Sequence, residues 1–499
     1  MTKIVRNLEA CSAGTYDLVI IGGGIYGIML SYEAVRRNLR PLLLEKNDFI
    51  SGTTLNHLRT VHGGVRYLQS LDIHRFRESV QERKWFLKYF PQFVRVMPCL
   101  MPLYGKGLYR NSIFRPALLL NDILSFNRNM SIEDKKQHLP RCKVISATKT
   151  KELYSAIDDR GLKGGAIWYD ANVEENQRLM MELLKLAITA GAAALNYVEA
   201  KALLKEENRV TGVVAMDGET GREYRFKAPV VINAAGPWCR EVAEALDKDQ
   251  QNLIKKRLLV WNILFRKEAL SSHALGVSPG KGKGHNYFFH PWKGRLLVGT
   301  GEVVVEKGPT ERIVPKNEIE TFLNDMNTIT PGLNLSEADI QRIYTGILPA
   351  DENGTMTKRE KIVAHAGNGG PHGLYSVSGI KFTTSRLVAE KALNRVFPNA
   401  QKMSHEKILE KRDLKNLSYS YDWEPSLEAD LGPLKEIIAA ESVMHLGDLV
   451  LRRTSLGDNP ERAIKILPKL RPLFACDDEK WNKEIGTLST QLSDPSTVK

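Results

Sequence analysis

Cysteine is scarce in this sequence, and no cluster of metal ligands accompanies it. The five cysteines of the 499-residue chain, Cys11, Cys99, Cys142, Cys239 and Cys476, include no C-x-x-C pair. Such usage suits a reducing compartment and provides neither a disulfide framework nor a zinc site. We therefore expect neither a disulfide-linked secreted fold nor a metal centre.

Long apolar runs are missing as well. Residues 1–15 lack the apolar core of a secretory signal, and no uninterrupted apolar stretch is long enough to span a bilayer. We expect a cytoplasmic protein, or one that lies on the cytoplasmic face of a membrane.

Acidic residues are in deficit, because 58 Asp and Glu stand against 71 Lys and Arg and leave a net charge of +13. This excess favours a phosphorylated substrate, an anionic membrane face or a nucleic acid as partner. No aromatic-basic recognition motif accompanies the charge, so we expect no nucleic-acid partner. At 499 residues, 42% of them hydrophobic, the chain is predicted to be globular with two or three domains.

The most informative segment that is present is residues 17–27, an apolar run that enters a glycine turn. Gly22, Gly24 and Gly27 stand at the GxGxxG spacing, and a helix and a second apolar strand follow, ending at Glu45. These glycines permit a tight turn, close approach of a pyrophosphate and close packing of helix on strand, while Glu45 can accept hydrogen bonds from a ribose diol. The complete βαβ pattern predicts a dinucleotide site with an unphosphorylated ribose.

The next segment, residues 48–67, is too polar and too rich in glycine to be core. Thr53 and Thr54 can donate hydroxyls to a pyrophosphate, and Arg59 can neutralise it. The alternative is a surface loop with caps and turns. Directly behind a dinucleotide fingerprint, the ligand-binding interpretation is favoured.

The same segment contains His62, whose paired glycines Gly63 and Gly64 allow close approach of the backbone to a ligand. Arg66 would project into the same region. A surface loop with caps and turns is the alternative here too.

Four segments together resemble the flavin-dependent glycerol-3-phosphate dehydrogenase family, which belongs to the FAD enzymes built like D-amino-acid oxidase. They are residues 22–27 (GGGIYG), Glu45-Lys46, Thr53-Thr54 and, above all, residues 61–68 (VHGGVRYL). The resemblance continues along nearly the whole chain and implies that the dinucleotide is FAD.

The expected fold class is α/β: a Rossmann-type FAD-binding domain, a substrate domain with an antiparallel sheet, and a C-terminal helical domain. Strand-like segments between residues 257 and 302 would form the sheet over the flavin. The predicted boundaries are 1–70, 160–245 and 350–400 for the FAD-binding domain, 71–159 and 246–349 for the substrate domain, and 401–499 for the helical domain.

The resemblance also implies a set of cofactor-binding residues in five segments. The last of these runs from a strand into a helix N-terminus, whose dipole would stabilise negative charge on the reduced flavin. The predicted cofactor-binding residues are Gly22, Gly24, Ile25, Tyr26, Gly27, Glu45, Lys46, Thr53, Thr54, Arg59, His62, Gly63, Gly64, Ala235, Gly236, Gly379, Lys381, Phe382, Thr383 and Thr384.

The predicted substrate-binding residues are Arg66, Trp261, Glu302, Arg359 and Lys381, of which Arg359 occupies the family's substrate-phosphate arginine position. Three family donors are replaced in this chain. They are an arginine before proline, where Leu348 stands, and the lysine and histidine of a Lys-Gly-x-His run, which are Val260 and Ile263 here. Their loss removes much of a phosphate clamp and weakens the assignment of the substrate.

The predicted catalytic residues are His290, Lys381 and Arg359. Hydride would pass from a substrate C–H bond to the flavin while a base takes the hydroxyl or amine proton. Because Ile263 replaces the family's histidine, His290 and His62 are the candidates for that base. His290 could equally be a satisfied residue of a sheet.

Three functions are consistent with the sequence. The first is oxidation of sn-glycerol 3-phosphate to dihydroxyacetone phosphate, with quinone as the acceptor that the resemblance implies. The second is an FAD dehydrogenase or oxidase of another hydroxy acid, polyol or amine, and the third is a basic flavoprotein that binds a membrane or nucleic acid without turnover. The family also docks on membranes, and the apolar residues around Arg110 and Arg115 fit a membrane interface or a helix that covers the substrate domain.

Overall fold

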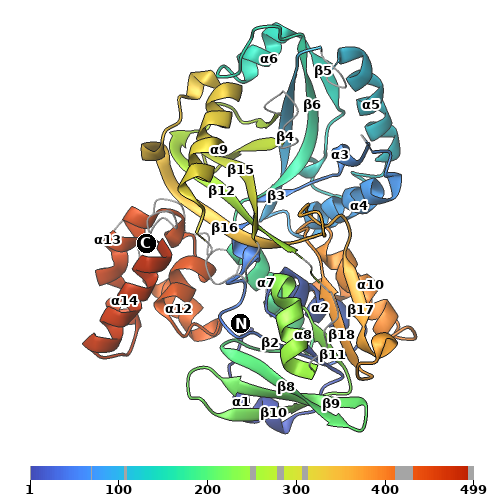
Figure 1. Ribbon diagram of the computed structural model, residues 1–499, viewed down its shortest axis with the longest axis vertical. Coiled ribbons are helices and arrows are strands. Elements are labelled where there is room, and N and C mark those ends of the chain that lie inside the picture. Colours follow the sequence, from blue (N-terminus) through green and yellow to red (C-terminus); the bar gives the residue numbers. More distant parts are fainter. Residues whose placement is uncertain are drawn as a thin grey trace.

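The computed structural model describes residues 2–68, 70–105, 110–247, 254, 256–277, 286–305, 313–410 and 431–492. Two halves, each built on a sheet, lie one above the other, and a lobe of helices lies beside their junction (Figure 1). Within the described part of the chain, no helix is both long and apolar enough to cross a membrane.

The lower half contains a six-stranded sheet that is parallel except at one edge. Its strands, in spatial order, are β17 (Lys361–Ala364), β18 (Leu374–Ser378), β11 (Val231–Asn233), β1 (Leu18–Ile21), β2 (Pro41–Leu44) and β7 (Ala193–Leu195), with β17 antiparallel to β18. Strands β1, β2 and β11 are buried along their whole length. Their unbroken apolar sequences follow from that burial, because both faces of the sheet are covered.

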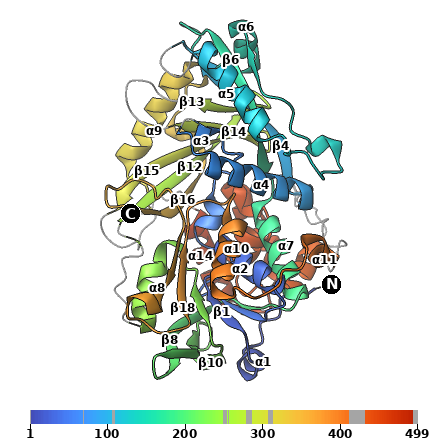
Figure 2. The same cartoon turned by 90° about the vertical axis from the view of Figure 1, so that its right-hand side faces the viewer.

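Helices cover one face of this sheet and a smaller sheet covers the other. The first layer is α2 (Ile25–Val35), α7 (Asn176–Thr189) and α10 (Ser385–Val396), which pack together with alternate residues of β1 and β2. The second layer is the antiparallel sheet β10–β9–β8 (Glu223–Lys227, Arg209–Asp217 and Val198–Glu206), together with α1 (Leu8–Ala13) and α8 (Cys239–Asp247). Figure 2 shows α2, α7 and α10 stacked against the sheet.

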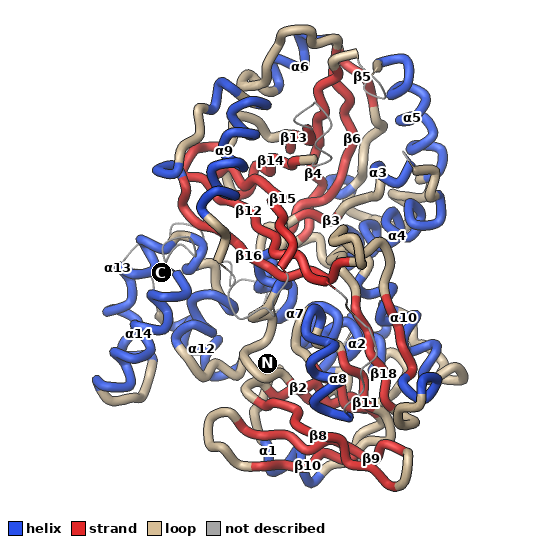
Figure 3. Tube along the Cα trace, viewed as in Figure 1, coloured by secondary structure: helices blue, strands red, loops and turns tan. Residues whose placement is uncertain are grey.

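The upper half is built on a nine-stranded, mainly antiparallel sheet, drawn in red in Figure 3. Its strands, in spatial order, are β16 (Ile340–Ala350), β12 (Lys256–Glu268), β15 (Arg295–Val305), β14 (Tyr287–Trp292), β13 (Ala274–Val277), β4 (Val94–Leu103), β6 (Gly164–Val173) and β3 (Thr60–Val61), with β5 (Lys143–Ile145) also paired to β6. The predicted FAD-binding segment 160–245 thus begins with a strand of this upper sheet. The chain returns to the lower half at α7.

Helices line the outside of the upper half. They are α3 (Val65–Leu68), α4 (Ile73–Tyr89), α5 (Asn111–Leu124), α6 (Ala147–Leu153) and α9 (Lys316–Ile329). The apolar face of α9 packs on β12, β14 and β15 and forms the largest core of this half.

The C-terminal lobe consists of α12 (Gly432–Ala440), the short helical segment η8 (Asp448–Arg453), α13 (Pro460–Leu470) and α14 (Asp478–Leu492), around an apolar core of its own. Helix α11 (His405–Leu409) precedes it and packs on the lower half. The remaining parts of the predicted segment 401–499, residues 411–430 and 493–499, lie outside the described residues.

Candidate active site

The predicted cofactor segments meet at one edge of the six-stranded sheet. Gly22 follows β1, Glu45 follows β2, Ala235 lies just beyond β11, and Gly379 follows β18. These four strands are parallel neighbours, so their carboxyl ends lie side by side. In open parallel sheets this edge is where ligands bind.

The glycine turn requires a backbone conformation and close contacts that only glycine allows. Gly22 has φ +109°, and a Cβ there would lie 2.7 Å from the carbonyl oxygen of Ala234. A Cβ on Gly27 would fall on the Gly22 carbonyl oxygen. At Gly24 a Cβ would meet only Thr54 Oγ1, at 3.2 Å, so the space in front of α2 is bounded by backbone and one hydroxyl.

The residues around this turn fit a dinucleotide. Glu45 Oε2 accepts a 2.6 Å hydrogen bond from the Gly23 N–H, and Thr54 Oγ1 accepts one of 3.0 Å from the Ile25 N–H. Burial raises the pKa of Glu45, although N–H donors oppose the change. A carboxylate and a hydroxyl beside a helix N-terminus are the groups that a ribose and a pyrophosphate require.

His62 forms a pair with Asp170 of β6. His62 Nδ1 lies 3.0 Å from Asp170 Oδ2, and the Gly63 N–H donates to Asp170 Oδ1 at 2.6 Å. Burial would raise the pKa of Asp170, but the hydrogen bond and charge of His62 and the charge of Arg83 hold it at about 2. The carboxylate therefore stays ionised and fixes the ring of His62, whose side chain is 51% exposed.

The two ends of the predicted cofactor site are joined by hydrogen bonds. Tyr26 OH accepts from the Lys381 N–H at 3.2 Å and donates to the Lys381 carbonyl at 3.1 Å. A Cβ on Gly379 would fall on the Tyr26 hydroxyl. The His62 N–H donates to Thr383 Oγ1 at 3.1 Å, which brings the His62–Asp170 pair next to the N-terminus of α10.

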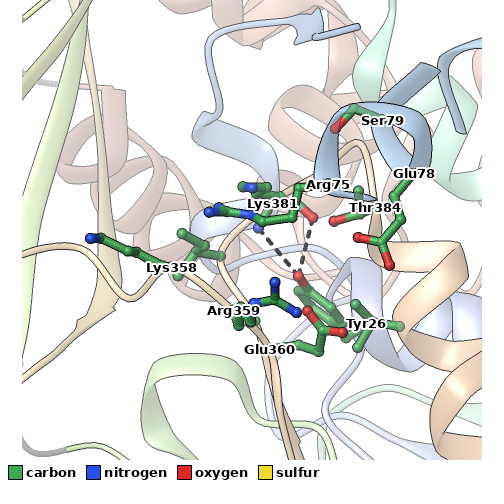
Figure 4. A pocket seen from close by; sticks show the side chains of 12 residues that line it. Tyr26, Arg75, Glu78, Ser79, Lys358, Arg359, Glu360, Lys381 and Thr384 are labelled. Atoms are coloured by element: carbon green, nitrogen blue, oxygen red, sulfur yellow. Dashed lines mark hydrogen bonds between the residues drawn. The ribbon is translucent and has the colours of Figure 1, made fainter. Parts of the chain in front are cut away.

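A pocket next to Tyr26 gathers four basic side chains: Arg75, Lys358, Arg359 and Lys381 (Figure 4). We call it the basic pocket. Lys381 Nζ lies 4.3 Å from the centre of the Tyr67 ring, and Arg75 Cζ lies 4.4 Å from the same ring. Such cation–π contacts hold cations at an aromatic face without neutralising them.

Acidic residues of the basic pocket are engaged by a lysine outside it. Lys391 Nζ lies 2.7 Å from Glu78 Oε1 and 2.7 Å from Glu360 Oε1. Burial and the neighbouring Arg75 lower the pKa of Lys381 to about 8, against the opposing charges of Glu360, Glu78 and Asp72. Asp72 Oδ2 lies 3.6 Å from Arg75 Nη1 and 3.8 Å from Arg359 Nη2. With Lys391 counted, five cations face three carboxylates, so the excess positive charge of the basic pocket suits an anion.

Three predicted residues do not lie where the sequence suggested. Arg59, predicted beside the pyrophosphate, is enclosed by the Trp292 and Tyr344 rings, with its Cζ 5.1 and 5.2 Å from their centres. Trp261, predicted as a pocket wall, is 2% exposed and packs in the core under α9. His290 is fully buried, and burial lowers its pKa to about 3, so this histidine is poorly placed to take a substrate proton.

The remaining predicted residues have other contacts or exposures. Thr53 binds β16, where its Oγ1 donates to the Ile347 carbonyl at 2.8 Å. The Phe382 ring stacks on His57, with ring centres 4.2 Å apart. Exposed residues are Lys46 and Arg66, and partly buried ones are Gly236, Glu302 and Thr384.

Sequence reasoning missed the partners of these groups. The role of Asp170 beside His62, and the presence of Arg75 and Lys358 in the basic pocket, follow only from the fold. Arg75 belongs to α4, in which charged residues alternate with the buried residues Phe76 and Val80.

The chain matches the family described as FAD dependent oxidoreductase (DAO) over residues 17–392. It is 31% identical over 409 residues to a glycerol-3-phosphate dehydrogenase of Synechocystis, covering 79% of this chain and 72% of that protein. The Arabidopsis thaliana mitochondrial glycerol-3-phosphate dehydrogenase SDP6 is 29% identical, covering 84% of this chain and 66% of that protein. The chain spans about half of the human mitochondrial relative, 52% of its length.

Solved structures support the same fold. The glycerol-3-phosphate dehydrogenase of Bacillus halodurans, complexed with FAD, aligns with a TM-score of 0.72 at 20% identity and covers 99% of this chain and 98% of its own. The L-alpha-glycerophosphate oxidase of Mycoplasma pneumoniae aligns with a TM-score of 0.59 at 16% identity, covering 78% of this chain and 97% of its own. The predicted fold class and cofactor are thereby confirmed. The chain belongs to the DAO family of FAD-dependent oxidoreductases.

Proposed function

We propose that this FAD-dependent oxidoreductase oxidises sn-glycerol 3-phosphate, or a closely similar small phosphorylated alcohol, at its secondary hydroxyl. The observation that carries the proposal is the basic pocket, which places Arg359 and Lys381 beside the cofactor segments. Relatives named glycerol-3-phosphate dehydrogenase support the choice of a phosphorylated substrate over a neutral one.

The replaced family donors do not remove the anion site. Leu348 and Val260 pack in one aliphatic cluster with Leu258 and Met356, and Ile263 is buried under α9. The charge they would have supplied comes instead from α4 and from the segment before β17. A dianionic phosphate needs several charge-assisted donors, and the four basic side chains supply them.

In the proposed reaction, His62 accepts the proton of the substrate hydroxyl on Nε2. Asp170, bonded to Nδ1, holds the ring and stabilises the protonated imidazole, as a carboxylate does in other histidine dyads. When bound, FAD would supply two-electron chemistry, as the acceptor for the hydride of the carbon that carries this hydroxyl. Lys381 and Arg359 orient the substrate through its anionic end.

We also propose that α5 rests on a membrane surface, where a quinone would receive the electrons. In Figures 1 and 2, α5 lies on the outside of the upper half. Phe114 and Leu118 face inward, whereas Leu119 is 62% exposed, Ile123 58%, and Phe126, just beyond the helix, 76%. Arg110 and Arg115 are exposed on the same helix or directly before it, as expected at an interface with anionic lipid.

The choice of substrate is tested by anaerobic bleaching of the bound flavin. We expect sn-glycerol 3-phosphate to bleach it, and glycerol, 2-hydroxy acids and amines to fail at equal concentration. Bleaching by a hydroxy acid or amine but not by the phosphate would overturn the proposal. The proposal also fails if no compound of the panel bleaches a flavin that dithionite still reduces.

His62→Gln should slow flavin reduction by substrate by about 10²-fold or more, because a positioned general base contributes that much. His290→Gln is the matched control, since His290 is a fully buried histidine of the upper sheet whose Nδ1 is bonded to the Leu58 carbonyl. Stopped-flow flavin absorbance measures both rates. Equal rates for His62→Gln and the parent protein would exclude His62 as the base.

Binding of the anionic substrate should weaken as pH rises through about 8, because Lys381, whose pKa is lowered to about that value, then loses its charge. Below pH 8 the lysine is protonated and the contact is complete. The expected loss is about tenfold in affinity, the value of one hydrogen bond to a charged group. Titration of the oxidised flavin spectrum with a non-reacting phosphate measures it, and Lys381→Arg should remove the dependence. A pH dependence that survives in Lys381→Arg belongs to another group.

The Leu119→Ser/Ile123→Ser double variant should reduce binding to anionic vesicles in a sedimentation assay, since it removes the apolar contact. Arg110→Gln/Arg115→Gln should lose the preference for anionic over zwitterionic lipid. Leu270→Ser, a partly exposed leucine elsewhere, is the control. Unchanged sedimentation of both double variants would remove α5 as the membrane contact.

A further inference from the structure

A loop that backs the glycine turn is attached to the C-terminal lobe. We call residues 45–54 the cofactor loop, because they run from Glu45 to Thr54, both of which contact the turn. The Ile50 N–H donates to the Gly23 carbonyl at 3.0 Å. The Phe49 ring lies under Gly23, where a Cβ would approach it to 3.0 Å. The shape of the turn thus depends on where this loop is held.

The centre of the cofactor loop is Asp48, and two arginines of η8 hold it. Arg453 donates from Nη1 to Oδ2 at 2.7 Å and from Nη2 to Oδ1 at 2.8 Å, while Arg452 Nε donates to Oδ2 at 2.7 Å. Asn196 adds a 2.9 Å hydrogen bond from its amide. Asp48 is 1% exposed, so these partners replace all of its water.

Ionisation of Asp48 is secured by the same contacts. Burial alone would raise its pKa, but the charges of Arg453 and Arg452 hold that pKa well below its usual range. The carboxylate is therefore charged wherever the protein is folded near neutral pH.

The C-terminal lobe fixes both arginines from behind. Arg452 Nη2 donates to Asp448 Oδ1 at 2.6 Å, and Arg453 Nε donates to the Glu441 carbonyl at 3.1 Å. Leu449 and Val450, between these residues in η8, are buried in the core of the lobe. The backbone that carries both arginines is therefore anchored in that core, and Asp448 and the Glu441 carbonyl hold their guanidinium groups.

Buried ion arrays of this kind add little net stability compared with apolar packing, and their best-attested use is to specify one arrangement. The arrangement specified here is the position of the cofactor loop. A lobe that served only as packing could cover the lower half with apolar contacts.

We propose that the C-terminal lobe controls retention of FAD, with Arg453 and Arg452 as positioning residues that act on the glycine turn through Asp48 and the cofactor loop. The inference depends on the FAD cofactor and is independent of which substrate the protein oxidises.

The test is the rate of FAD release from the purified holoenzyme, followed as the rise of flavin fluorescence after dilution. Arg453→Gln should accelerate release at least about tenfold, a loss equivalent to 1.4 kcal/mol. Arg453→Lys, which keeps the charge but not the two-pronged contact, should fall between that variant and the parent.

Arg178→Gln is the matched control. Arg178 of α7 also makes a buried, two-pronged pair across the lobe interface, with Glu441 at 2.8 and 2.9 Å. It donates in addition to Glu182 and to the backbone carbonyl of Arg453, but it contacts neither the Arg453 guanidinium nor the cofactor loop. It should lower the unfolding temperature like Arg453→Gln while it leaves FAD release within about twofold of the parent. If Arg453→Gln fails to fold, Asp48→Asn gives the same readout from the loop side.

Equal acceleration by Arg453→Gln and Arg178→Gln would show general loosening and overturn the proposal. Unchanged FAD release in Arg453→Gln or Asp48→Asn would overturn it as well. Failure of the substrate proposal would leave these rates unaffected, so the two are distinguished.

Discussion

The structure depends on the contact between two backbones, at Gly22 and Ala234. The Ala234 N–H donates to the Ile21 carbonyl at 2.8 Å, and the strands before both residues are parallel neighbours. Because Gly22 has no side chain, the two strand ends approach closely enough for everything beyond them to share one edge. Segments as far apart in sequence as Glu45 and Gly379 therefore reach the same site. Without this approach, the glycine turn and the N-terminus of α10 would bound different spaces.

The sequence predicted well the part of the fold around the site in which the pattern is local, the strand, glycine turn, helix and strand of β1, α2 and β2. The glycine spacing, the two strands and Glu45 all lie within 30 residues, so one βαβ pattern contained them. Side-chain direction was harder to predict. Arg59 follows the polar segment as expected, but its guanidinium is captured by Trp292 and Tyr344, more than 230 residues later. Trp261 was predicted to bind substrate, but the register of β12 against β15 turns its side chain into the core. That register cannot be read from the neighbouring residues in the sequence.

The pair of His62 and Asp170 shows why the rest could not be predicted. Val61 pairs with Ala171 in the antiparallel β3–β6 ladder, so continuing that register places His62 opposite Asp170. Neither segment by itself contains a sequence signal that predicts this pairing. The position of Arg75 could not be predicted either. It is one of several charged residues of α4, and its place in the basic pocket depends on α10 and on the segment before β17. Contacts between segments far apart in the sequence determine where these residues lie, and a single sequence gives no signal for such contacts.

The replaced family residues lie next to one another in the sheet, so a substitution at one position affects which residue fits at the next. Trp261 lies directly opposite Gly301 in the β12–β15 ladder, and any side chain at Gly301 would collide with the indole. A large residue on one strand therefore requires a small one on the other. Likewise, Leu348 lies opposite Leu258 and packs in one cluster with Val260, so a lone charge restored at one of these positions would be buried among aliphatic groups. The loss of one donor thus favours the loss of the next. The anion binding that we propose therefore depends on donors on another wall, those of the basic pocket.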